Sequence, residues 1–124
     1  MPKSSPLPRL LLIGWDGADW EFLHPMLDRG ELPALNALVD AGVIGNLATL
    51  SPCLSPLLWT SIATGQTADR HGILGFIEPT PDGAGVRRVS STSRRSKALW
   101  NITSQSGLRS IVVGWHASYP AERI

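Results

Sequence analysis

The fold is decided by residues 9–17, which read RLLLIGWDG. Strands that are buried on both faces, as in a parallel sheet, have uninterrupted apolar runs of this kind. We therefore predict that residues 9–15 form a central strand, with Asp16 at its carboxyl end. Ligands of open α/β sheets bind at such strand ends, which makes Asp16 a candidate catalytic or metal-binding carboxylate. Asp16 would equally suit the cap of a helix that begins near Asp19, so both interpretations stay open.

The segments that follow alternate between helical and extended patterns. Apolar residues recur at helical spacing, with glycine or proline near the ends, in the ranges 19–29, 33–41, 56–64 and 97–106. Apolar runs typical of strands occupy residues 43–50 and 110–115, and residues 75–96 are rich in turn residues. This order predicts an α/β fold, in which an open, mostly parallel sheet carries helices on both faces.

Ser55 stands directly before Pro56 and an apolar helical pattern. Serine as the N-cap, followed by proline at the first helical position, is an ordinary way to begin a helix. The same geometry has a functional interpretation, because the unpaired N–H groups and the positive dipole at a helix N-terminus favour a phosphoryl group. A serine hydroxyl is a weak nucleophile, however, and needs a base or a metal ion to release its proton.

Composition and charge exclude several classes of protein. With 43% hydrophobic and 17% charged residues, the chain is typical of a folded domain. Five basic residues lie close together, and we interpret them as a solvated loop without the aromatic residues of a nucleic-acid surface: Arg87, Arg88, Arg94, Arg95 and Lys97. The single cysteine, Cys53, excludes an internal disulfide. No apolar run approaches the ~20 residues of a membrane span, so we expect a cytoplasmic protein without a membrane partner.

The three histidines and a search for common enzyme motifs do not identify a reaction. His71 is interpreted as a turn residue that hydrogen-bonds the backbone, and His24 as a solvated residue on a polar helix face. His116 follows the last apolar run and is the better placed of the three to be a ligand. The G-x-S-x-G, G-x-x-x-x-G-K and G-x-G-x-x-G motifs are absent from the sequence. The residues alone therefore indicate an α/β domain and name no reaction.

Four ordered blocks carry a resemblance to a known family. They read LIGWDGADW (12–20), LPAL (32–35), SPLLWTSIATG (55–65) and HGI (71–73). In this order they resemble the type I phosphodiesterase/nucleotide pyrophosphatase branch of the alkaline phosphatase superfamily. The resemblance runs from about residue 10 to residue 124 and implies an alkaline-phosphatase-like fold.

The resemblance also implies roles for two residues. Asp16 matches a metal ligand of the family, and Ser55, nine positions before Thr64, matches the nucleophile, whose oxygen also contacts a metal ion. It implies two divalent metal ions, usually zinc, a phosphoseryl intermediate, and a small phosphate ester as substrate. Phosphodiesterases of the family have asparagine where this chain has Leu58, which puts nucleotide specificity in doubt. Sulfatases need proline and arginine where this chain has Leu57 and Trp59, which disfavours a sulfatase.

Family members are much longer than this chain, and their other metal ligands lie further along the sequence. We therefore expect residues 9–124 to be the N-terminal portion of one hydrolase domain, incomplete and inactive alone, after a flexible lead-in at residues 1–8. The remaining ligands would then lie beyond residue 124. The alternative is a non-catalytic α/β module that binds an anionic ligand or a partner protein. The sequence does not indicate an oligomeric state.

Overall fold

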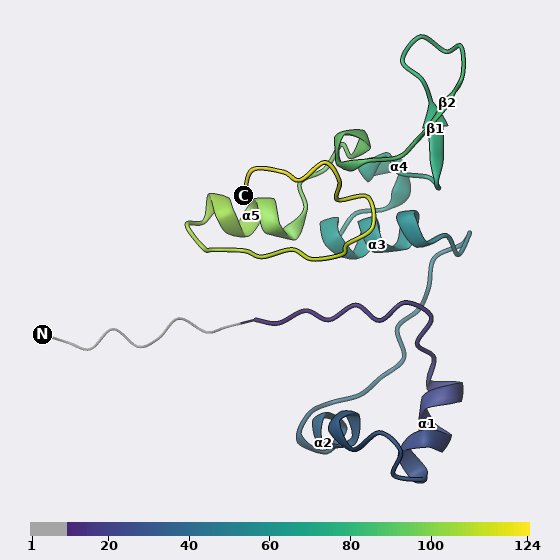
Figure 1. Cartoon of the computed structure of the whole chain (residues 1–124), viewed down its shortest axis with the longest axis vertical. Helices are drawn as coiled ribbons and strands as arrows, with labels where there is room; N and C mark the ends of the chain where they lie inside the picture. Colours follow the sequence, from purple (N-terminus) through teal and green to yellow (C-terminus); the bar gives the residue numbers. More distant parts are fainter. Residues whose placement is uncertain (1–9) are drawn as a thin grey trace, which may run out of the picture. The chain divides into compact units, whose positions relative to one another are not determined.

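Residues 10–124 are described by a computed structural model (Figure 1). The predicted lead-in at residues 1–8, together with Arg9, lies outside the described residues. The chain divides into two compact units, Met1–Leu47 and Ala48–Ile124.

Two helices form the described part of the first unit, α1 (Trp20–Asp28) and α2 (Pro33–Ala41). Helix α1 begins after Asp19, whose side-chain Oδ1 accepts a hydrogen bond from the backbone N–H of Glu21 at 2.9 Å. Proline opens α2, where its missing N–H costs no intrahelical bond. The indole Nε1 of Trp20 donates to the carbonyl oxygen of Gly45 at 3.1 Å. Both predicted helices are therefore confirmed within a residue or two of their ends.

Helices α3 (Ser55–Thr64) and α4 (Ala68–His71) open the second unit. Gly65, with φ of 64°, ends α3 in the left-handed conformation that glycine adopts without steric cost. Inside α3 the hydroxyl of Thr60 donates to the carbonyl oxygen of Pro56 at 2.6 Å, on the buried side of the helix. The predicted helix at 56–64 is confirmed, and it begins one residue earlier than expected.

A short antiparallel hairpin follows, formed by β1 (Ile77–Pro79) and β2 (Val86–Arg88). Ile77 pairs with Arg88 and Pro79 with Val86, and an ion pair of 2.8 Å joins Glu78 to Arg87 across the strands. Figure 1 shows the hairpin extending away from α3. A 3-10 turn at Ser91–Ser93 leads into α5 (Leu99–Gln105), which confirms both the turn-rich segment and the last predicted helix.

The predicted strands are not found among the described residues. Residues 10–15, 43–50 and 110–115 are not assigned as strands, and the one sheet found among residues 10–124 is the two-stranded antiparallel hairpin. The structure is thus a small α/β arrangement, and the predicted parallel sheet is not shown. A strand exists through hydrogen bonds to a neighbouring strand, and an apolar sequence does not supply that neighbour. Leu10 and Ile111 accordingly remain 84% and 92% exposed.

The core of the second unit is small. Ala63 of α3 packs with Ala98 and Trp100 at the start of α5, and Val112 and Trp115 lie against this cluster. The segment 110–115 therefore keeps one property of a strand, since Val112 faces the core while Ile111 faces solvent. Packing of this segment against α3 and α5 is what places the residues after it close to Ser55's helix.

Candidate active site

Ser55 is the first residue of α3, and the backbone of Leu54 is the N-cap. The prediction that Ser55 caps the helix is wrong, because the carbonyl oxygen of Leu54 already accepts the first intrahelical bond, from the N–H of Leu58 at 3.0 Å. No side chain makes a capping hydrogen bond at this end of α3. Ser55 is half-buried, and Pro56 and Leu57 beside it are buried. The Ser55 hydroxyl therefore lies at the N-terminal end of a helix whose first turn is partly buried, and it does not serve as the cap.

Asp16 occupies a β-turn in the first unit. The N–H of Ala18 donates to the carbonyl oxygen of Trp15 at 3.3 Å, and Gly17 has φ of 72°. Glycine is favoured at this third position of a turn, because other residues adopt a positive φ at a steric cost. The interpretation of Asp16 as a helix cap is wrong, since Asp19 caps α1. The exposed carboxylate of Asp16 thus follows the apolar run, as predicted, and its role as a metal ligand stays a prediction.

His71 is fully buried at the end of α4. Its Nδ1 accepts a hydrogen bond from the N–H of Ile73 at 3.2 Å, so in the neutral ring Nε2 carries the proton and donates to the hydroxyl of Ser61 at 2.9 Å. Burial lowers the pKa of His71, and the nearby Arg94 lowers it further while Asp69 opposes both. The interpretation as a backbone-bonding turn histidine is confirmed. This tautomer holds α3 against α4 and gives Ser61 no base.

His71 should make stability depend on pH. Its pKa is lowered in the folded chain, so the unfolded chain binds more protons as the pH falls below about 6.5, and the free energy of unfolding then decreases. We expect a slope of at most about 1.4 kcal/mol per pH unit from this group. Urea unfolding between pH 7.5 and 5 measures it. His71→Gln should flatten the slope, whereas His24→Gln, at an exposed histidine stacked on Trp20, should leave it unchanged.

Two tryptophans and a histidine pack together beside α3. Trp59, four residues after Ser55 on α3, packs edge-on against Trp115 with ring centroids 5.2 Å apart. His116 stacks on the same Trp59 ring at 6.2 Å with an interplanar angle of 21°. Residues four apart share a helix face, so Ser55 and Trp59 lie on one face of α3, and His116 contacts that face through the Trp59 ring. His116 is thus the histidine that stacks on Trp59, four residues after Ser55.

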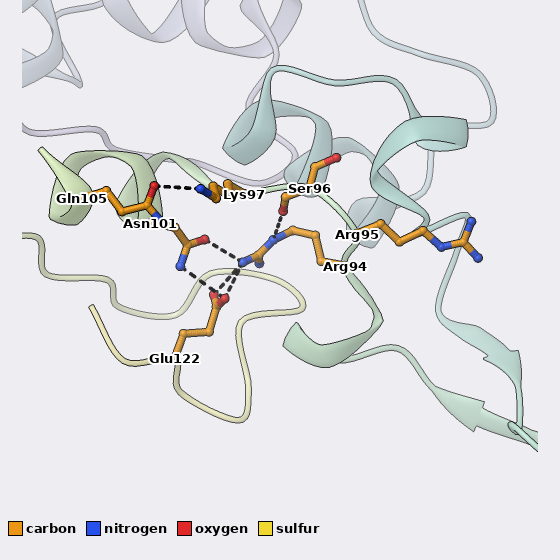
Figure 2. Close-up of a pocket in the computed structure, with 7 residues that line it drawn as sticks. All are labelled: Arg94, Arg95, Ser96, Lys97, Asn101, Gln105 and Glu122. Carbon is orange, nitrogen blue, oxygen red and sulfur yellow. Dashed lines mark hydrogen bonds and ion pairs between the residues drawn. The ribbon is translucent and has the colours of Figure 1, made fainter.

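Arg94 was wrongly interpreted as part of a solvated basic loop. Its side chain is 5% exposed and forms an ion pair of 2.7 Å with Glu122. Both residues line a pocket of about 280 Å³, whose other lining residues are Arg95, Ser96, Lys97, Asn101 and Gln105. Figure 2 shows these side chains. No signal in the sequence joins Arg94 to a carboxylate 28 residues away. Neither Asp16 nor Ser55 lines this cavity.

The metal ligands implied by the resemblance are incomplete. Within residues 10–124, no three His, Cys, Asp or Glu side chains come close enough together to hold a metal ion. Asp16 belongs to the first unit and Ser55 to the second, and two zinc ions need roughly six protein ligands once waters are counted. The residues described therefore do not by themselves fit a two-metal site.

The described part of the chain contains no helix that is long and apolar enough to cross a membrane.

The comparison with protein families agrees with the sequence blocks. Residues 10–124 match the family described as type I phosphodiesterase / nucleotide pyrophosphatase, and the chain belongs to this family. Membership places it among hydrolases of small phosphate esters or nucleotides, which are generally metal-dependent. No curated protein and no solved structure matches the chain significantly.

Proposed function

We propose that this chain contributes the nucleophile and one metal ligand to a phosphodiesterase or pyrophosphatase that works as part of a longer enzyme. The observation that carries the proposal is the position of Ser55 as the first residue of α3, a helix whose next two residues are buried. Ser55 also lies within the family match, which spans residues 10–124. The first-turn N–H groups of such a helix lack intrahelical partners and favour an anionic phosphoryl group. Family membership favours this enzyme over the alternative of a non-catalytic module that binds an anion or a protein.

The proposed reaction transfers the phosphoryl group to Ser55. The Ser55 oxygen forms a bond to phosphorus, the bond from phosphorus to the departing oxygen breaks, and the Ser55 hydroxyl proton passes through water to that oxygen, which leaves as an alcohol or a phosphate. Water then attacks the same phosphorus, the bond from phosphorus to the Ser55 oxygen breaks, and a proton of the attacking water restores the Ser55 hydroxyl as the phosphate product departs. Asp16 and the Ser55 oxygen are the proposed ligands for divalent metal, with zinc expected and two ions per site; the other ligands are proposed to lie beyond residue 124. A metal ion supplies Lewis-acid stabilisation of the phosphoryl oxygens when it is bound.

Asp16 should prove to be a metal ligand. In the full-length enzyme, Asp16→Asn is expected to weaken metal binding, because a neutral amide is a poorer ligand than a carboxylate for a divalent cation. Turnover should recover in part at high metal concentration. Metal content and affinity measure the effect, with Asp19→Asn as the control that alters a helix cap three residues away. Unchanged metal affinity in Asp16→Asn would remove Asp16 from the site.

The 124 residues alone should be catalytically silent, because within residues 10–124 no three His, Cys, Asp or Glu side chains are grouped so that they could hold a metal ion. The test adds excess zinc or manganese to the purified chain and assays a chromogenic phosphodiester beside the full-length enzyme. We expect turnover from the full-length enzyme only. Metal-dependent turnover by the 124 residues that Ser55→Ala abolishes would show that they hold a complete site.

A further inference from the structure

The segment after residue 115 is bonded to the 3-10 turn at Ser91–Ser93 and to α5. The N–H of Ser91 donates to the carbonyl oxygen of Tyr119 at 2.9 Å, and the Ser91 hydroxyl donates to that of Pro120 at 2.6 Å. Further along, the carboxylate of Glu122 reaches α5. Figure 1 shows this C-terminal segment running beside α3 and α5.

The Glu122 carboxylate is the centre of a polar network. It accepts two hydrogen bonds of 2.7 Å from Nη2 of Arg94, one of 2.7 Å from the indole of Trp100 and one of 3.3 Å from Asn101 (Figure 2). Arg94 also donates to the side-chain oxygen of Asn101 at 3.0 Å, and its guanidinium lies 5.2 Å from the Trp100 ring centroid. Burial raises the pKa of Glu122, but the hydrogen bonds from Arg94 and Trp100 outweigh it and lower the pKa overall. Glu122 thus fixes the orientation of the Trp100 indole.

The Trp100 ring is linked to α3 by ring contacts through the indole of Trp115. The rings of Trp100 and Trp115 meet edge-on with centroids 5.9 Å apart, and Trp115 in turn meets Trp59 edge-on at 5.2 Å. Trp115 also donates its indole N–H to the carbonyl oxygen of Trp59 at 3.0 Å. Aromatic pairs in this geometry are favourable beyond the apolar area that they bury. Three indoles therefore connect the Glu122 network to the helix that begins at Ser55.

His116 lies in the 115–118 turn, which begins at Trp115 and is therefore attached to α3 by the contacts between Trp115 and Trp59. The hydroxyl of Ser118 donates to the carbonyl oxygen of Trp115 at 2.7 Å, and Ala117 has φ of 53°. A positive φ at alanine is unfavourable and persists only where the surroundings enforce it. Here the enforced turn sets His116 against Trp59, one helical turn from Ser55. The position of His116 thus depends on contacts made on both sides of the turn.

We propose that Glu122 is a positioning residue: through Trp100 and Trp115 it holds the 115–118 turn so that His116 stacks on Trp59, the residue one helical turn after Ser55. The inference deepens the proposed function and rests on it for the identity of the site. The hydrogen bonds of the Glu122 carboxylate come from Arg94, Trp100 and Asn101. In this proposal Glu122 acts on His116 by fixing the indoles of Trp100 and Trp115.

The test compares Glu122→Gln with Glu78→Gln in the 124-residue chain. Both variants neutralise a carboxylate that is paired with an arginine, and Glu78 pairs with Arg87 in the hairpin. The readouts are the NMR shifts of the His116 ring protons, which the Trp59 ring displaces from their denatured-chain values, and hydrogen exchange of the Trp115 indole N–H. We expect Glu122→Gln to remove most of the displacement of His116 and to speed the exchange at least about tenfold, and Glu78→Gln to change neither.

Neither readout needs turnover, so the result stands apart from the fate of Ser55 as nucleophile. A merely structural Glu122 would lower the stability of the chain but leave the folded-state shifts of His116 in place. Unchanged His116 shifts in folded Glu122→Gln, or equal changes in both variants, would overturn the proposal. If Glu122→Gln does not fold, Glu122→Asp, which keeps the charge but shortens the side chain, decides by the same criterion.

Discussion

Ser55→Ala in the full-length enzyme is expected to lower turnover of a phosphodiester by at least about 10³-fold, the order expected when a hydrolase loses its nucleophile. The fold should remain intact. Ser55 is not the N-cap of α3, and the end of the helix has no side-chain capping bond to lose. Steady-state kinetics and the circular dichroism of the variant measure the two effects.

Two variants control for this result. Ser55→Thr keeps a hydroxyl in the same place and should retain measurable turnover. Ser61→Ala removes another α3 hydroxyl, which bonds His71, and should cost about 1 kcal/mol of stability with little loss of turnover. Near-normal turnover by Ser55→Ala would remove Ser55 from the mechanism.

The largest loss of stability is expected from Arg94→Ala. This change leaves the Glu122 carboxylate beside Trp100 without its ion-pair partner, in a network where the Arg94 side chain is 5% and the Glu122 side chain 26% exposed. Breaking a buried ion pair by removing one partner is strongly destabilising. Because Glu122 is partly exposed, we expect the free energy of unfolding to fall by about 3 kcal/mol, at the low end of the range for buried pairs. Urea unfolding followed by tryptophan fluorescence measures the free energy of unfolding.

Arg87→Ala is the matched control for that measurement. It breaks the ion pair with Glu78, in which the arginine side chain is 46% exposed, and should cost no more than about 1 kcal/mol. Arg94→Lys keeps the charge but has one nitrogen in place of the guanidinium, in which Nη2 bonds Glu122 and Asn101 while Nε bonds the carbonyl oxygen of Ser96, so its cost should fall between the two. Equal losses in Arg94→Ala and Arg87→Ala would contradict the assignment of a buried network.

Helices were predicted well because the information that specifies them is local. Apolar spacing, Pro33 and Pro56 near helix starts, and Gly65 after α3 all act within a few residues of the chain. The turn at Asp16 was also predictable, because Gly17 favours the conformation that ends the apolar run. The family match covers residues 10–124 and so includes the four sequence blocks that carry the resemblance.

Strands and polar networks could not be predicted in the same way, because both depend on distant partners. The run at 110–115 is apolar enough for a strand, yet a hydrogen-bonded neighbour is needed to make it one. Arg94 belongs by sequence to a basic run, and its burial follows from Glu122, which lies 28 residues further along the chain. His116 likewise gains its place from Trp59, through a contact between residues far apart in the sequence.

The central claim is that Ser55 carries the phosphoryl group during turnover. The direct measurement is to quench the full-length enzyme with acid while it turns over a phosphodiester, digest it, and examine by mass spectrometry the peptide that contains Ser55. We predict the mass of a covalently attached phosphoryl ester on Ser55, absent before substrate is added and absent in Ser55→Ala. An adduct on another residue, or continued turnover with Ser55 never modified, would contradict the claim.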